Sequence, residues 1–210
     1  MMVFGKGMKV VLWGALAIMT PGRKAFAQVL TNTSEGVLSA NIPFGNLTPG
    51  NSTTPASTEI QFNIRSNNDN GYRVLASAVF NVAPTSSAQG GTTVSASDIG
   101  VGISSVVNGN ATRTPRVDTV ASGFNYNPAT VAAVNGLTPY GGAASGRATL
   151  SDIVANPNTT ILSGPKIANN QGINNQNNFL TVTITFGLVG QFFTPATLSG
   201  MLTLTIVNIP

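Results

Sequence analysis

Apolar and polar residues alternate in four well-separated stretches of the chain. Residues 38–44 and 60–65 show this alternation in the first half, and residues 180–186 and 202–206 show it near the end. Successive side chains of a β-strand point to opposite faces of its sheet, so each stretch predicts a strand with one buried apolar face. In the last two stretches the polar positions are Thr, whose branched side chain suits the outer face of a sheet.

A turn signal follows the second stretch. Residues 67–71 have the sequence Asn-Asn-Asp-Asn-Gly, whose members tolerate the positive φ angles of tight turns. Residues 72–80 then alternate again, beginning with Tyr72 and Val74 on the apolar side. We therefore predict a β-hairpin that joins the strand at 60–65 to a returning strand at 72–80.

The middle of the chain, residues 83–178, is less regular. Its composition predicts loops at 83–91 and 138–146, and an exposed Asn/Gln-rich loop at 169–178. Short strands are predicted at 92–97, 99–106, 117–122, 147–154 and 159–162. No helix is predicted after residue 27.

Together these elements predict an all-β fold for residues 28–210. Short alternating strands between turn signals are typical of a single antiparallel, immunoglobulin-like β-sandwich of about seven to nine strands. Two smaller domains are the alternative, because a length of 210 residues suits either arrangement.

The first 27 residues have the organisation of a secretory signal peptide. Lys6 and Lys9 form a positively charged region, and an apolar run follows at residues 10–19. Ala-Phe-Ala at 25–27 is a cleavage motif of the A-x-A type. We therefore expect the exported protein to begin at Gln28.

The apolar run is too short for a permanent membrane span. As a helix it rises about 15 Å, half of the roughly 30 Å hydrocarbon core. We expect no stable span after cleavage, and we expect the mature protein to be secreted or to lie at the cell surface. Arg23 and Lys24 stand between the run and the cleavage motif, which leaves an uncleaved signal anchor as an alternative.

The distribution of charge argues against nucleic acid as a partner. The whole chain has a formal net charge of +4, but four of its ten basic residues lie within the first 27. Six basic and six acidic residues follow, so the mature chain has no net charge. The acidic residues are Glu35, Glu59, Asp69, Asp98, Asp118 and Asp152. Binding to a phosphate backbone needs clustered Lys and Arg, which this balance does not provide.

Neither Cys nor His occurs in the sequence. Disulfides, thiolate and imidazole metal ligands, Cys nucleophiles and Ser-His-Asp triads are therefore excluded. Glycosidase chemistry needs two facing carboxylates, and we interpret the six acids as solvated surface groups. Ser104, Ser105 and Thr183 are potential nucleophiles, but no base lies beside them in the sequence. We therefore expect no cofactor, no bound metal and no enzymatic activity.

Three segments carry motifs that resemble one protein family. Their sequences are Ile-Pro-Phe-Gly-Asn-Leu-Thr-Pro-Gly at 42–50, Asn-Gly-Tyr-Arg-Val at 70–74 and Pro-Ala-Thr-Leu-Ser-Gly-Met-Leu-Thr-Leu-Thr-Ile at 195–206. They resemble the F-G-x-x-x-P-G segment, the hairpin return and the closing strand of bacterial exported β-sandwich proteins of the spore-coat-U and fimbrial-subunit type. The chain departs from that family in lacking cysteines and in having Leu198 where an aromatic residue is common. The resemblance implies a surface protein with a β-sandwich fold.

Two functional classes fit these observations. The first is an exported structural subunit of a pilus, a fimbria-like filament or a coat, which associates with copies of itself or with other surface subunits. The alternative is a monomeric secreted adhesin or carbohydrate-binding module, whose binding surface would consist of aromatic residues in predicted loops. These aromatic residues are Tyr126, Tyr140, Phe192 and Phe193. They would otherwise fold over the ends of the sandwich.

Residues 28–36 offer a strand for self-assembly. This segment precedes the first predicted strand, and Glu35 is its one charged residue. Its strand-forming residues are Val29, Leu30, Thr31 and Thr33. Such a segment can pair with the exposed sheet edge of a neighbouring subunit. An ordinary edge strand within the same subunit is the alternative.

Overall fold

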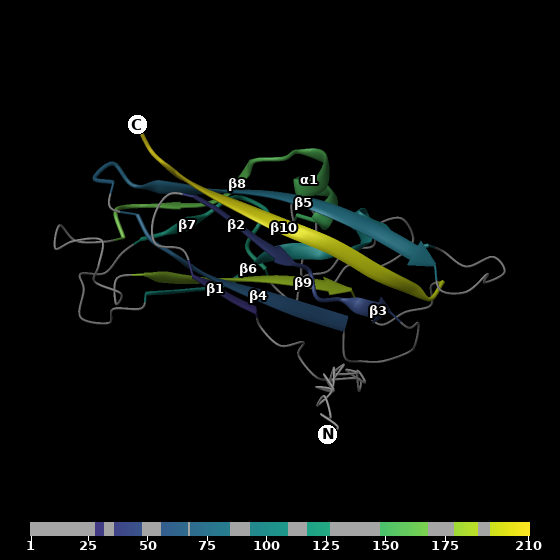
Figure 1. The fold of residues 1–210 in the computed structure, drawn as a ribbon. Helices are drawn as coiled ribbons and strands as arrows, with labels where there is room; N and C mark the ends of the chain where they lie inside the picture. The colour runs from purple at the N-terminus through teal and green to yellow at the C-terminus, as the bar shows by residue number, and fades with distance from the viewer. Residues whose placement is uncertain are drawn as a thin grey trace, which may run out of the picture.

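The computed structural model of the chain is a β-sandwich. It describes residues 28–31, 36–47, 56–66, 68–84, 93–108, 117–126, 148–167, 179–188 and 194–210. Two sheets pack face to face, as Figure 1 shows, and the predicted all-β sandwich is confirmed. The predicted signal peptide, residues 1–27, lies outside the described residues.

The first sheet has four strands, in the spatial order β1, β4, β9 and β6. Their bounds are β1 Gln28–Thr31, β4 Ala56–Ile64, β9 Leu180–Leu188 and β6 Gly100–Asn108. β4, β9 and β6 pair antiparallel, whereas β1 runs parallel to β4 at the edge of the sheet. We call this sheet A.

The second sheet, sheet B, is built around the long antiparallel pair β5 and β10. Its strands lie in the order β2, β10, β5, β8 and β7, and β3 pairs with the first residues of β10. Their bounds are β2 Gly36–Asn41, β3 Gly45–Leu47, β5 Tyr72–Pro84, β7 Thr119–Val120, β8 Thr159–Gly164 and β10 Ala196–Asn208. With sheet A this gives ten strands among the described residues, more than the seven to nine expected.

The core between the sheets consists of the apolar positions that alternation predicted. Residues 38–44, 60–64, 180–186 and 202–206 each contribute their apolar side chains, all at most 9% exposed. Phe44, in the turn between β2 and β3, packs edge to face against Phe186 of β9, with ring centroids 6.4 Å apart. The buried faces of all four predicted strands are therefore confirmed, although the first strand, β2, ends at Asn41 and residues 43–44 form a turn.

The predicted hairpin between residues 60–65 and 72–80 is wrong. β4 pairs within sheet A and β5 within sheet B, so the segment between them crosses from one sheet to the other. The turn itself is present: the Gly71 N–H donates to the Asn68 carbonyl at 3.1 Å, and Gly71 has φ +98°. Turn chemistry fixed the reversal of the backbone, but it does not determine which sheet the next strand joins.

Two segments predicted as strands are helical. Residues 147–154 overlap the helix α1, Leu150–Ala155, and residues 92–97 lead into the 3₁₀-helix η1, Ala96–Asp98. Leu150 and Ile153 stand three positions apart and both are buried, which is the spacing of one helix face. The expectation of no helix after residue 27 is therefore wrong. Of the other short predictions, β6 and β8 confirm the strands at 99–106 and 159–162, and β7 is shorter than the predicted 117–122.

The outer face of β9 also differs from expectation. Thr183 and Thr185 are 6% and 3% exposed, so this central strand is buried on both faces at these positions. The Thr185 hydroxyl lies 2.7 Å from the Ser104 hydroxyl, and the Thr181 hydroxyl donates to the Asn63 amide oxygen at 2.9 Å. The Thr side chains thus form a polar network with the flanking strands.

Candidate functional site

The predicted assembly strand lies at the edge of sheet A. Val29, Leu30 and Thr31 belong to β1, while Thr33 lies outside the described residues. The register pairs Gln28 with Ile60, Val29 with Gln61, Leu30 with Phe62 and Thr31 with Asn63. Within one copy of the chain, β1 therefore occupies the edge of its own sheet, which is the arrangement that the sequence left as the alternative.

The structure does not bring the four candidate aromatic residues together in a described patch. Tyr140, Phe192 and Phe193 lie outside the described residues. Tyr126 is half-buried, and its backbone N–H donates to the Ile103 carbonyl at 3.0 Å. This residue lies against β6 rather than at an exposed loop tip.

The interpretation of the acids as solvated surface groups is wrong for Asp98. Its side chain has no exposed surface, and its Oδ2 accepts bonds from the Ser95 N–H at 2.8 Å and the Ser95 hydroxyl at 2.7 Å. No described hydrogen bond reaches its other oxygen, Oδ1. Asp118 is half-buried and accepts a bond from the Tyr72 hydroxyl at 2.7 Å. Both carboxylates have structural partners.

Asp98 and Asp152 occupy equivalent places in a motif that occurs twice. The two copies are Ser-Ala-Ser-Asp-Ile at 95–99 and Thr-Leu-Ser-Asp-Ile at 149–153. In the second copy the Thr149 N–H donates to Asp152 Oδ2 at 2.7 Å, as Ser95 does to Asp98. In both, the Asp three residues after a Ser or Thr closes the helix start. The spacing of Ser or Thr and Asp, three residues apart, is visible in the sequence and indicates a helix start at both places.

The two copies of the motif also lie side by side. The Leu150 N–H donates to the Ile99 carbonyl at 2.8 Å, and the Val101 N–H donates to the Ala148 carbonyl at 3.2 Å. Helix α1 thus packs against η1 and also against β5, beside which Figure 1 shows it. The carboxylates serve as helix caps, and neither faces a second carboxylate across a described cleft.

The candidate nucleophiles lie on the outer face of sheet A, in strands β6 and β9. Ser104 is the extra residue of a β-bulge in β6, between Ile103 and Ser105. Its hydroxyl donates to the Thr183 carbonyl at 3.4 Å and lies 2.7 Å from the Thr185 hydroxyl. Among the described residues no Lys or carboxylate bonds to Ser104 directly, and the nearest link is through Thr185, whose hydroxyl also donates to Glu59 Oε1 at 3.5 Å.

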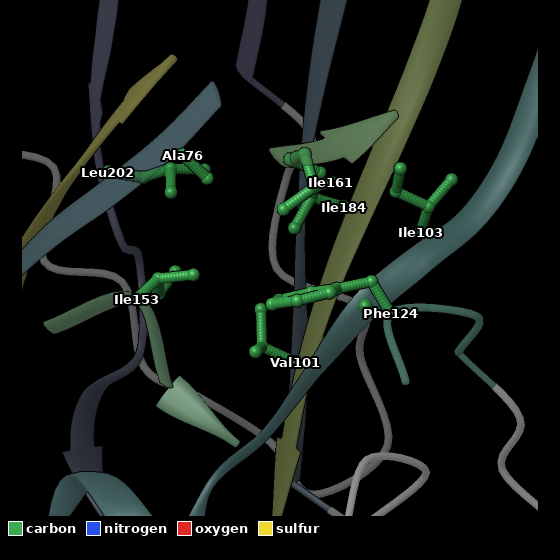
Figure 2. A pocket seen from close by; sticks show the side chains of 9 residues that line it. Ala76, Val101, Ile103, Phe124, Ile153, Ile161, Ile184 and Leu202 are labelled. Carbon is green, nitrogen blue, oxygen red and sulfur yellow. The ribbon is translucent and has the colours of Figure 1, made fainter. Parts of the chain in front are cut away.

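A small apolar cavity lies between the sheets. Figure 2 shows it enclosed by side chains of both sheets and of α1, including Ile103, Phe124, Ile153 and Ile184. Its volume of about 10 Å³ is at the lower limit for one water molecule, and its apolar lining offers a water no partner. It is a packing defect of the core, too small for a substrate.

The described residues contain no group of three or more metal-ligating side chains. They also contain no helix of the length and apolarity that a membrane span needs. The ion pair between Lys166 and Asp69, 2.5 Å long, joins a half-buried amine to a carboxylate that is 86% exposed, so it adds little stability.

No protein-family model matches this sequence. A comparison with curated proteins finds no relative either.

Proposed function

We propose that this protein is an exported structural subunit of a surface filament or coat, and that its copies associate by addition of the strand β1 to a neighbour. The observation that carries the proposal is the position of β1. It is a four-residue strand at a sheet edge, and it runs parallel to its partner in a sandwich whose other paired strands are antiparallel.

The attachment of β1 to its own chain is limited. Four residue pairs hold it to β4, and parallel pairing is slightly less stable per residue than antiparallel pairing. β1 belongs to sheet A, whereas β2 begins five residues after Thr31 in sheet B. A short connection between sheets favours exchange of a terminal element between copies, because the exchanged strand makes the same contacts in either chain.

The charge of the mature chain agrees with assembly. Residues 28–210 carry six basic and six acidic side chains, and proteins that stay monomeric usually keep a net charge away from zero. Sheet edges in such proteins also usually carry charges. No described residue of β1 is charged.

The test compares the mature chain, residues 28–210, with a variant that lacks residues 28–35 and keeps β2 intact. Both should give the circular dichroism spectrum of a β protein. We expect the full mature chain to form filaments, seen by light scattering and negative-stain microscopy, and the shortened one to form none. A synthetic peptide of residues 28–35 should bind the shortened protein, and a scrambled peptide should not.

A full mature chain that stays monomeric at high concentration, on cells that carry no filament or coat containing it, would refute the proposal. The adhesin interpretation would then replace it. No described observation favours that interpretation now, because Tyr126 is half-buried and the other three aromatic residues lie outside the described part of the chain.

A further inference from the structure

The described strands at the borders of the two sheets differ in how open they are. β7 has two residues and β1 has four. β6 contains the bulge at Ser104, and Ile103 within it forms an isolated bridge with Asn125. On the other side of sheet B, β8 pairs with β5 along Tyr72–Ala76, and α1 also packs against β5. β2 pairs with β10 over Gly36–Asn41 without interruption, and no described strand lies on its other side. The part of β5 after Ala76 also lacks a described strand on one side, but it ends in Pro84, which cannot donate to a ladder.

The register determines which backbone groups of β2 face this open side. The Ile42 N–H, just after β2, donates to the Gly200 carbonyl of β10 at 2.9 Å. In an antiparallel ladder, residues that bond to the partner alternate with residues that do not. Leu38 and Ala40 therefore bond to β10, and the N–H and C=O groups of Val37, Ser39 and Asn41 point to the open side.

The residues of β2 itself lack the features by which a strand protects an exposed edge. It contains no charged residue, no Pro and no bulge, and these are the usual means of preventing pairing between sheets. Val37 is 63% exposed although it is apolar. Three residues with outward backbone groups thus offer six hydrogen-bonding groups to another strand.

We infer that β2 pairs antiparallel with β2 of a second copy of this chain, about a two-fold axis at Ser39. This inference rests on the proposed function, because it names an edge through which copies associate. In this register Ser39 faces Ser39 of the second copy, and Val37 faces Asn41, so the three outward-bonding residues of each copy meet each other. Sheet B then continues from one copy into the next.

The alternation of backbone groups selects this axis. Opposing residues of an antiparallel pair have side chains on the same face of the sheet. The two-fold axis must therefore lie level with one residue of β2, which then faces its own copy, and not level with the bond between two residues. With the axis at Ser39, the outward groups of Val37, Ser39 and Asn41 form six backbone hydrogen bonds. With the axis at Leu38, only Val37 and Ser39 would pair within β2, and they would form four.

A second copy suits this edge better than a charged partner does. An uncharged strand that pairs with itself brings no like charges together and leaves no opposite charge unmatched. A two-fold contact uses the same patch on both copies, so it needs no second binding surface. The edge belongs to sheet B, whereas β1 belongs to sheet A, although the two strands come into contact where the sheets face each other.

The first experiment uses the absence of Cys from the chain, which makes every introduced thiol unique. In the mature protein, Ser39→Cys places two thiols opposite each other, with Cα atoms about 5.5 Å apart, within the range of a disulfide. Val37→Cys places them about 14 Å apart along the strands, which is too far. We expect a disulfide-linked dimer for S39C and none for V37C on a non-reducing gel after mild oxidation.

Absence of the S39C dimer at a concentration where the protein self-associates would overturn the inference. Cross-linking only in a mixture of S39C and V37C would place the axis at Leu38, and would overturn the register as stated. Equal cross-linking of S39C and V37C would indicate random collision and would also overturn it.

The second experiment weakens the contact without using a thiol. Ser39→Pro removes an N–H that points to the open side and makes no bond to β10, and Ser39→Ala is the control that keeps this N–H. Ser39→Lys opposes two like charges at the axis, and Asn81→Lys adds the same charge at an exposed position of β5. We expect S39P and S39K to raise the dimer dissociation constant at least about tenfold, and S39A and N81K to leave it unchanged.

Analytical ultracentrifugation gives the constants, and circular dichroism checks the fold. S39K keeps the backbone N–H, so it decides the question if S39P does not fold. Unchanged dimerisation of S39K would overturn the inference. The variant that lacks residues 28–35 separates the two proposals. If it forms β2 dimers but no filaments, both proposals are supported. If S39K forms filaments but no dimers, both are supported as well, because this variant loses the β2 contact and keeps the β1 strand.

Discussion

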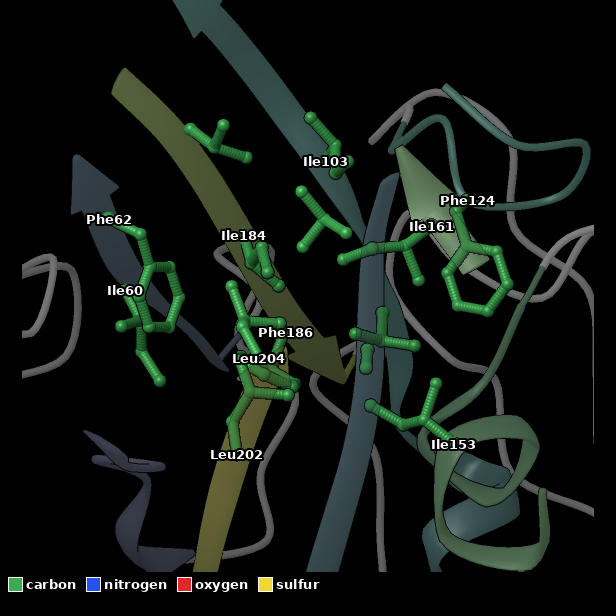
Figure 3. Packing of buried hydrophobic residues seen from close by; sticks show 14 of the residues in the cluster. Ile60, Phe62, Ile103, Phe124, Ile153, Ile161, Ile184, Phe186, Leu202 and Leu204 are labelled. Atoms are coloured by element: carbon green, nitrogen blue, oxygen red, sulfur yellow. The ribbon is translucent and has the colours of Figure 1, made fainter. Parts of the chain in front are cut away.

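Helix α1 contributes to the core through Ile153, and replacing this residue tests that contribution directly. Ile153 is 1% exposed, and Figure 3 shows it beside Ile161 and Phe124, between the two sheets. It also lines the existing cavity. We predict that Ile153→Ala strongly destabilises the fold, although α1 has six residues and lies outside both sheets.

The size of the effect follows from burial. Ile→Ala removes three carbon atoms, and at about 0.8 kcal/mol for each buried carbon the transfer contribution is about 2.4 kcal/mol. The space left behind adds to the cavity of about 10 Å³ already present, and neighbours from two sheets restrict its collapse. We therefore expect a loss of about 3–4 kcal/mol in the free energy of unfolding, and a fall in Tm of roughly 6–16 °C for a chain of this length.

Val154 provides the matched control, because it follows Ile153 on the same helix and is 37% exposed. Val154→Ala should change stability by less than about 1 kcal/mol, since Ala favours the helix more than Val does. Urea unfolding followed by circular dichroism measures both variants, with similar m-values expected. Equal and small effects of the two substitutions would refute the packing of α1 into the core.

Four further substitutions test other contacts by the same urea unfolding. Tyr72→Phe removes the hydroxyl that donates to Asp118, and should cost about 1.5–2 kcal/mol because the acceptor is charged but half-buried. Asn68→Ala removes the amide that donates to the Gly71 and Ile209 carbonyls at 3.0 and 2.7 Å, and should cost about 1–2 kcal/mol and loosen the end of β10. Asp98→Ala should cost about 2 kcal/mol and Asp152→Ala about 1 kcal/mol, because the same cap is buried in one motif and exposed in the other; the reverse order would contradict this assignment.

The long strands were predictable because burial on one face leaves a period of two in the sequence. Ile60, Phe62 and Ile64 are all fully buried, and the polar residues between them face outward. The rule fails in β9, where Thr183 and Thr185 look like outer-face residues but are buried. Their burial depends on the strands on either side, and the alternation within one strand contains no information about its neighbours.

The short elements were harder to predict because their local signals compete. The segment 147–154 contains β-branched residues at positions that also suit a strand, but the pair Thr149 and Asp152 closes a helix start. The same spacing occurs at Ser95 and Asp98. A search for this capping pattern would have found both helical turns, although it would not have shown that Asp98 is buried and Asp152 exposed.

The candidate assembly edges show the same division between local and tertiary information. The sequence identified residues 28–36 as a segment with one charged residue, Glu35, at the start of the mature chain, and the structure adds that β1 is parallel and short. Nothing in residues 36–41 distinguishes an edge strand from a central one, since both would alternate in this way. The open side of β2 follows only from its pairing with β10, and the outward direction of the Ser39 backbone follows only from the bond between Ile42 and Gly200. A residue whose side chain looks unremarkable in the sequence is thus placed, by its backbone groups, at the centre of the proposed contact between copies.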